Sequence, residues 1–263
     1  MTSINIGGAE LQYQDKGSGP VVLFLHGFPL SLAMWDEQEA LASRYRVVRF
    51  DARGFGQSAV GDSLLTMDRI ADDAAVLIEK LRLGPVVLVG CSMGGYAAFS
   101  FVRKHAALLR GLVLVDTRAG ADTQDARLGR KTLAARVSRE GARVAMEAFL
   151  PKTVGDTTKK TRADVVAKLK DVMMATAPQG IVNALHGLAA RADSTPTLRE
   201  IKVPTLVICG EEDVITPPAE AKKLKDGIKG AELVVIPKSG HLPSMETPDV
   251  FNALLRSFLK QFA

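Results

Sequence analysis

The chain is poor in several residue types that mark particular classes of protein. Of its 263 residues only two are cysteines and four are histidines, and 5% are aromatic. Cys91 and Cys209 each end a predicted interior strand, so we expect both to be buried thiols in a reducing cytoplasm. No apolar run approaches the roughly 20 residues that a membrane-spanning helix requires, so no membrane partner is expected.

The N-terminal residues also lack a leader pattern. A secretory signal has a basic segment followed by an apolar one, and the sequence Met-Thr-Ser-Ile-Asn at residues 1–5 has neither. We therefore expect a cytoplasmic protein.

The net charge of +5 is concentrated in one part of the chain. Residues 117–200 hold 15 Lys and Arg against 9 Asp and Glu. These basic residues are spread through predicted helices and are not interleaved with aromatic residues, so a nucleic-acid partner is not expected. We interpret them as a solvated face; attraction of anionic substrates is the alternative.

What the sequence does contain is an alternation of short apolar runs and helical patterns. Residues 67–81 show apolar positions at helical spacing, and helices are also expected over 219–226 and 248–259. Strands alternating with helices predict an α/β fold with a mostly parallel eight-stranded sheet and helices on both faces. The strands are expected at residues 3–6, 10–15, 21–25, 45–50, 85–90, 109–115, 205–209 and 233–236.

The alternation stops between Asp116 and Pro204, where the chain is helical. We expect four helices there, over residues 125–140, 142–150, 161–177 and 180–190. An insertion between two strands would lie over the carboxyl edge of the sheet, where open α/β sheets bind ligands. The predicted organisation is thus a core of residues 1–117 and 198–263 with a helical cap, or lid, of residues 118–197.

The most informative segment is the pentapeptide Gly90-Cys91-Ser92-Met93-Gly94. It stands between an apolar strand and a helical pattern, which is the setting of a nucleophile elbow. Glycines two residues before and two after the serine remove side chains that would clash in so sharp a turn. We therefore predict Ser92 as a catalytic nucleophile.

A serine nucleophile needs a base, and the base needs an orienting carboxylate. His241 follows the last strand, and Asp213 follows the seventh, in the chain order Ser…Asp…His that α/β-hydrolases use. We predict Ser92, Asp213 and His241 as the catalytic residues. Asp116, at the end of the sixth strand, is the alternative acid. His186, in a predicted cap helix, is expected to be an ordinary helix residue.

The transition state of acyl transfer also needs oxyanion donors. The backbone N–H of Met93 begins the helix after the elbow, and the N–H of Phe28 follows Gly27, which allows a close approach. These two N–H groups are the predicted oxyanion hole. Pro29 has no N–H, and His26 is expected to brace the loop by hydrogen bonding.

These motifs resemble the α/β-hydrolase superfamily over the whole chain. The matches are His-Gly-x-Pro at 26–29, Asp-x-Arg-Gly-x-Gly-x-Ser at 51–58, the elbow at 90–95, Gly-x-x-Asp at 210–213 and Gly-His at 240–241. Ser-Met-Gly-Gly-Tyr, Asp-Thr-Arg-Ala at 116–119 and Gly-His-Leu-Pro-x-Met-Glu at 240–246 resemble serine carboxylesterases of the 3-oxoadipate enol-lactonase-like group. The segment 51–58 is expected to support the structure near the nucleophile.

The resemblance implies a carboxylesterase that cleaves small esters or lactones through an acyl-enzyme, without a metal or an organic cofactor. We expect a substrate pocket that includes His26, Gly27, Pro29, Phe149 and Leu242. Further cap residues either line this pocket or pack the cap, and about half are expected to face the cavity; they are Met146, Leu150, Met173, Met174 and Ile181. The sequence predicts no oligomeric state.

Other activities stay open on the same catalytic residues. They are lactone opening, carbon–carbon bond hydrolysis and cofactor-free perhydrolysis, in which Pro29 would place a carbonyl to accept a hydrogen bond from peroxide. A non-catalytic ligand receptor is the alternative from another class. Ser92 stands where dehalogenases and epoxide hydrolases of this fold carry aspartate, and Phe28 replaces the second glycine of the proline iminopeptidase loop.

Overall fold

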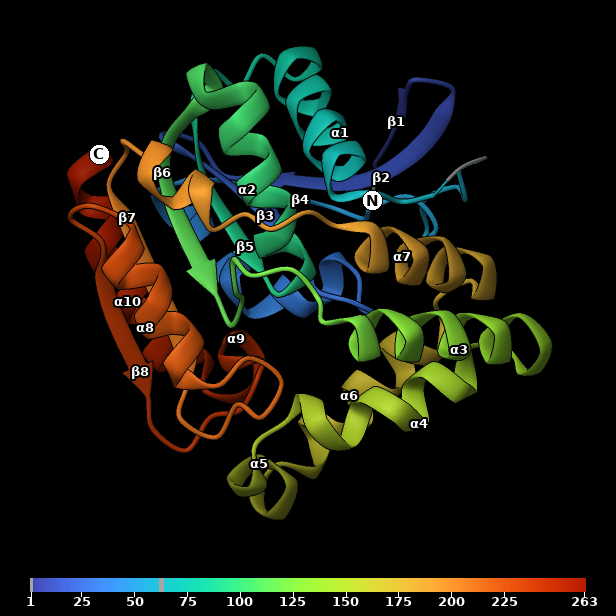
Figure 1. Ribbon diagram of the computed structural model, residues 1–263. Helices are drawn as coiled ribbons and strands as arrows, with labels where there is room; N and C mark the ends of the chain where they lie inside the picture. The colour runs from blue at the N-terminus through green and yellow to red at the C-terminus, as the bar shows by residue number, and fades with distance from the viewer. Residues whose placement is uncertain (1, 62–63) are drawn as a thin grey trace.

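A computed structural model describes residues 2–61 and 64–263 of the chain, and Met1, the first residue of the predicted core, lies outside them. The described residues form an eight-stranded sheet in the order β1-β2-β4-β3-β5-β6-β7-β8 (Figure 1). Its strands are β1 (Thr2–Ile6), β2 (Ala9–Lys16), β3 (Val21–Leu25), β4 (Arg46–Phe50), β5 (Val86–Cys91), β6 (Leu109–Val115), β7 (Thr205–Gly210) and β8 (Glu232–Ile236). All eight predicted strands are confirmed, with boundaries shifted by at most one residue.

Only the first two strands depart from the parallel arrangement. Gly7 and Gly8 have φ angles of +54° and +84°, a left-handed pair that glycine adopts without strain and that closes a tight hairpin. β1 and β2 pair antiparallel, β2 also pairs antiparallel with β4, and the remaining pairs are parallel. The carboxyl ends of β3, β5, β6, β7 and β8 therefore meet at one edge of the sheet.

Alternate residues of the parallel strands pack into two separate cores. On β5, Val86 and Leu88 join one cluster of buried residues, whereas Val87 and Val89 join the other. The first cluster includes residues of α1 (Met67–Lys80), α2 (Met93–His105) and α8 (Pro218–Gly227). The second includes residues of the 3₁₀ segment η1 (Leu32–Ser43) and of α10 (Pro248–Leu259). Helices thus cover both faces, as the run of apolar strand residues predicts.

The segment between β6 and β7 is helical, and we call residues 118–197 the helical insertion. It contains five α-helices where the sequence predicted four: α3 (Gln124–Glu140), α4 (Ala142–Thr153), α5 (Asp156–Thr161), α6 (Ala163–Met174) and α7 (Pro178–Ala190). The short helix α5 and the segment η1 were not predicted. Figure 1 shows the insertion gathered at the end of the molecule to which the arrowhead of β6 points.

The chain is completed by short elements around the sheet. They are the 3₁₀ turns η2 (Ala106–Leu108), η3 (Pro196–Glu200) and η4 (Lys260–Phe262), and the helix α9 (Pro243–Glu246). Among the described residues, no helix has both the length and the apolar character needed to cross a membrane.

Candidate active site

Ser92 occupies a strained turn between β5 and α2. Its φ and ψ angles are +52° and −111°, a combination that residues other than glycine rarely adopt. A Cβ added to Gly90 would lie 2.5 Å from the carbonyl oxygen of Gly94, and one added to Gly94 would lie 2.2 Å from that of Leu25. Both glycines are therefore required by close backbone approach, as the sequence pattern predicts.

Neighbouring strands hold this turn in place. The Ser92 N–H donates to the carbonyl of Val115 at 3.0 Å, and the Thr117 hydroxyl donates to the carbonyl of Ser92 at 2.9 Å. The elbow is thus fixed to the end of β6, which presents the Ser92 side chain to the edge of the sheet where the insertion lies.

His241 and Asp213 lie together at the same edge. The Nδ1 atom of His241 is 2.8 Å from Oδ2 of Asp213, and both side chains are buried. A ring nitrogen that donates to a carboxylate leaves Nε2 as the acceptor, which is the tautomer that a general base requires. Ser92 and His241 line the same pocket.

The Asp213 carboxylate is held by four hydrogen bonds. Oδ1 accepts from the N–H groups of Ile215 and Thr216, and Oδ2 accepts from the Thr216 hydroxyl and from His241. Burial alone would raise the pKa of Asp213, but the charge of His241 and these donors together hold it below its usual range. Asp213 is consequently an anion throughout the neutral pH range.

Asp116 lies beside this pair, and its pKa is shifted in the opposite direction to that of Asp213. Among the described residues, single ligand atoms of Asp116, Asp213 and His241 lie within 4.8 Å of one another. Asp116 Oδ1 accepts from the N–H of Gly210 at 2.9 Å, and Oδ2 is buried without a hydrogen bond that meets distance and angle limits. Burial, followed by the charge of Asp213, raises the pKa of Asp116 well above its usual range.

The ligand atoms of these three side chains are close enough together to bind one metal ion. The donors already described occupy both oxygens of Asp213, however, and His241 Nδ1 is directed at one of them. A metal ion would have to displace these hydrogen bonds, so the arrangement fits an orienting carboxylate better than a metal ligand.

The loop after β3 supplies the other part of the site. His26 is buried, with Nδ1 2.9 Å from the Gly27 carbonyl, and its Nε2 accepts from the N–H of Ala52. Burial lowers the pKa of His26 to about 4. A neutral ring with both nitrogens engaged braces this loop against the segment after β4, as expected from the sequence.

The two backbone donors predicted for the oxyanion hole flank Ser92. A Cβ added to Gly27 would lie 3.5 Å from the Ser92 Cβ, so this loop passes directly beside Ser92, and Phe28 and Met93 line the pocket with it. Met93 begins α2, where the first N–H groups have no partner within the helix.

Glu246 has a role that the sequence motif did not reveal. Its buried carboxylate accepts hydrogen bonds from the N–H groups of Gly155, Gly240 and Leu242 and from the Thr158 hydroxyl. It therefore ties the loop that carries His241 to the insertion. Glu246 falls within the Gly-His-Leu-Pro-x-Met-Glu match, but its four partners become visible only in the fold.

The pocket over Ser92 differs in part from the predicted one. Of the predicted residues, Phe28, Met93 and Phe149 line it, together with Tyr96, Arg130, Leu188 and Ile215, which were not predicted. Leu242 and Met173 are packed in the core instead, and Ile181 joins the other core. The sequence shows that the residues on one helix face are apolar, but only the packing decides which of them line the cavity.

Pro29 and the remaining predicted residues also lie away from this lining. The Pro29 carbonyl accepts a hydrogen bond from the Thr176 hydroxyl at 3.2 Å, which links the loop to the insertion. Met146 and Leu150 pack against the second core, whereas Met174 is exposed and His186 is half-buried.

Arg130 brings charge to an otherwise largely apolar pocket. Its Nε donates to Asp122, which also forms ion pairs with Arg118 at 2.7 Å and Arg191 at 3.0 Å. Burial acts to raise the pKa of Asp122, but the arginines outweigh it and lower the value to about 2. Three guanidinium groups thus share one carboxylate, and one of the three, that of Arg130, lines the pocket.

Comparison with known proteins agrees with this geometry. The family model of the alpha/beta hydrolase fold matches residues 20–248. The chain therefore belongs to the α/β-hydrolase family, as the sequence motifs predicted, and it is a hydrolase.

Individual relatives have several activities. A malate-bound structure of a thermophilic esterase from Thermogutta terrifontis superposes with a TM-score of 0.95 at 40% identity, covering 99% of this chain and 97% of that one. The AB hydrolase superfamily protein YisY of Bacillus subtilis is 33% identical over 93% of both chains. The 3-oxoadipate enol-lactonase 1 of Acinetobacter baylyi is 28% identical, covering 96% of this chain and 94% of the relative.

Proposed function

We propose that the protein is a serine carboxylesterase that hydrolyses small carboxylic esters through an acyl-enzyme. The observation that supports this most strongly is the meeting, in one pocket, of the strained Ser92 and of His241 with its Asp213 partner. The similarity to the Thermogutta esterase supports the same substrate class.

In the proposed reaction, Ser92 Oγ attacks the ester carbonyl while His241 Nε2 takes the serine proton. The Asp213 carboxylate stabilises the imidazolium that forms, without itself taking a proton. The N–H groups of Phe28 and Met93 meet the developing oxyanion. His241 then protonates the leaving alcohol, and a water molecule, deprotonated by His241, releases the acid and restores Ser92.

The helical insertion is proposed to act as a cap over this site. It contributes Arg130, Phe149 and Leu188 to the pocket lining, so its residues would select the substrate while the core carries the chemistry.

Lactone hydrolysis is the second candidate. The similarity to the Acinetobacter enol-lactonase supports it, and a lactone is an internal ester that would use the same residues and steps. Perhydrolysis stays an alternative without a specific contact in its favour, because the Pro29 carbonyl is engaged by Thr176.

Replacement of Ser92 tests the proposal. Ser92→Ala is expected to lower kcat on p-nitrophenyl esters by a factor on the order of 10⁶, as for other serine nucleophiles. The variant should keep its fold by circular dichroism, because the change only shortens a small side chain. A folded Ser92→Ala protein that retained more than a few per cent of the activity would refute the assignment.

A further inference from the structure

The pocket over Ser92 is too small for an ester as it stands. Its volume of about 30 Å³ accommodates one or two water molecules, whereas ligand sites typically measure about 300–1,000 Å³. Productive binding at this site, on the proposed function, therefore requires additional space next to Ser92.

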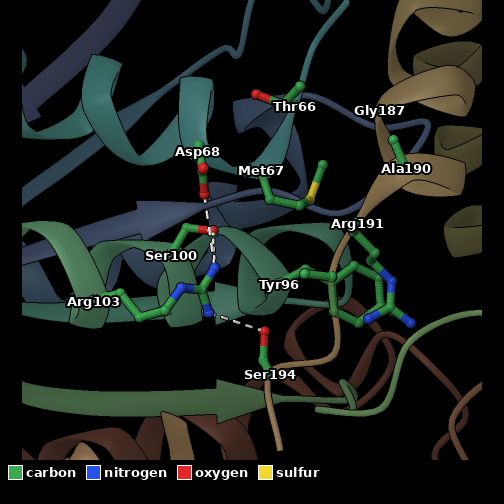
Figure 2. Close-up of a pocket in the computed structure, with 11 residues that line it drawn as sticks. Thr66, Met67, Asp68, Tyr96, Ser100, Arg103, Gly187, Ala190, Arg191 and Ser194 are labelled. Atoms are coloured by element: carbon green, nitrogen blue, oxygen red, sulfur yellow. Dashed lines mark hydrogen bonds and ion pairs between the residues drawn. The ribbon is translucent and has the colours of Figure 1, made fainter. Parts of the chain in front are cut away.

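That space exists on the other side of Tyr96. A cavity of about 330 Å³, which we call the chamber, lies between α1, α2 and α7 (Figure 2). Tyr96 lines both the chamber and the pocket over Ser92. On α7, Leu188 lines the pocket while its neighbour Gly187 lines the chamber.

Tyr96 is buried in the first core cluster, and its ring stacks on Arg191. The Arg191 guanidinium carbon lies 4.0 Å from the centre of the Tyr96 ring, and Figure 2 shows the two groups together. Within residues 2–61 and 64–263, the Tyr96 phenol makes no hydrogen bond. Rotation of the ring would break this stacking contact and part of the apolar packing around Tyr96, but no hydrogen bond.

Two arginines and one aspartate line the chamber; they are Arg103, Arg191 and Asp68. The Arg103 guanidinium is held by the hydroxyls of Ser100 at 2.8 Å and Ser194 at 3.1 Å. Its acidic neighbour Asp68 is 3.7 Å away and 59% exposed, so solvent weakens that pair. Arg191 adds a second guanidinium, which is paired with Asp122 at 3.0 Å and whose Nε is buried without a hydrogen bond among the described residues.

We propose that Tyr96 is a movable partition and that the chamber binds the carboxylate-bearing arm of the substrate. When the ring swings aside, the pocket and the chamber form one site, with the ester group at Ser92 and the carboxylate near Arg103. The substrates would then be small esters with a carboxylate on one arm. The inference rests on the proposed function for the position of the ester group but not for carboxylate binding in the chamber.

The test is to fill the chamber from its rim. Ala190 lines the chamber and is exposed, so Ala190→Trp obstructs the cavity without disturbing the core. Ala135→Trp, at an exposed position of α3 that lines neither cavity, is the matched control.

Two pairs of substrates separate the possible positions of the carboxylate. Mono-p-nitrophenyl glutarate against p-nitrophenyl pentanoate places it on the acyl arm, and 4-butyryloxybutanoate against butyl butyrate places it on the alcohol arm. Ala190→Trp is expected to lower kcat/KM for at least one charged ester by about tenfold or more relative to its neutral partner, the cost of an unmet charged contact. Equal effects on charged and neutral esters, or none, would overturn the proposal.

Two further measurements do not depend on comparing ester turnover in Ala190→Trp alone. Asp68→Asn, which removes the competing carboxylate, should lower KM for the charged ester and not for its neutral partner. Glutarate titrated calorimetrically into Ser92→Ala should bind, and binding should be lost in Ser92→Ala/Ala190→Trp. Glutarate that binds equally to both proteins, or to neither, contradicts the chamber even if ester hydrolysis is confirmed. Chamber-dependent binding without turnover of any ester would instead contradict the proposed function alone.

Discussion

Two buried aspartates lie a few ångströms apart after β6 and β7, and their surroundings shift their pKa values in opposite directions. Asp213 accepts four hydrogen bonds, among them one from His241, and its pKa lies below the usual range. Asp116 accepts one from the N–H of Gly210, and burial together with the charge of Asp213 keeps its pKa well above that range. Both side chains are buried, so the number and placement of hydrogen-bond donors decide which carboxyl is favoured as the anion that can orient the histidine.

Replacing Asp213 should lower the catalytic activity more than any other change to these two aspartates. Asp213→Asn preserves the shape but favours the wrong tautomer of His241, so kcat should fall by roughly 10⁴-fold. Steady-state hydrolysis of p-nitrophenyl butyrate measures this, with Asp116→Asn assayed in parallel. If Asp116→Asn proved the more damaging of the two, the orienting acid would belong at the end of β6.

Removing one hydrogen-bond donor from Asp213 should make its pKa less different from that of Asp116. Thr216→Val deletes the hydroxyl that donates to Asp213 Oδ2 at 2.6 Å, and leaving that carboxylate short of a partner should lower kcat/KM by about tenfold. Thr216→Ser keeps the hydroxyl and should retain most of the activity. A larger loss in Thr216→Ser than in Thr216→Val would mean that the Thr216 methyl group, rather than its hydroxyl, matters.

Asp116→Asn should change activity little. A protonated carboxyl and an amide have nearly the same shape and can both donate a hydrogen bond. We expect kcat/KM to stay within about threefold of the original value, since no charge is removed at neutral pH. A fall that grew with pH would show that ionised Asp116 takes part in catalysis.

The same substitution should stabilise the protein, and the gain should depend on pH. A group whose pKa is raised by folding stabilises the folded state below its unfolded pKa, and this contribution is lost as the pH rises toward the folded value. The melting temperature of Asp116→Asn relative to the original protein should therefore increase from about pH 4 upward. A difference that was constant with pH would show that Asp116 is ionised in the fold.

The sequence predicted the sheet and the elbow well, because both depend on local patterns. Glycines at positions 90 and 94 identify Ser92, and apolar runs identify the strands. It left the choice between Asp116 and Asp213 to chain order, because both follow a strand and their donors come from other parts of the fold.

Elements stabilised by distant contacts were harder to predict. The helix α5 has the sequence Asp-Thr-Thr-Lys-Lys-Thr, with low helical propensity. It is held by Glu212, which accepts from the N–H and hydroxyl of Thr157. The contribution of Arg130 to the pocket depends on how α3 packs against α4 and α7, and no local pattern around residue 130 indicates it.

The central claim is that Ser92 forms the covalent intermediate. Diethyl p-nitrophenyl phosphate acylates no residue but phosphorylates activated serines, and it can be followed by intact-protein and peptide mass spectrometry. We predict one diethyl phosphate per chain, located on Ser92, with one equivalent of p-nitrophenolate released and esterase activity lost in parallel. Full labelling at another residue, or complete labelling that leaves hydrolysis unchanged, would contradict the account.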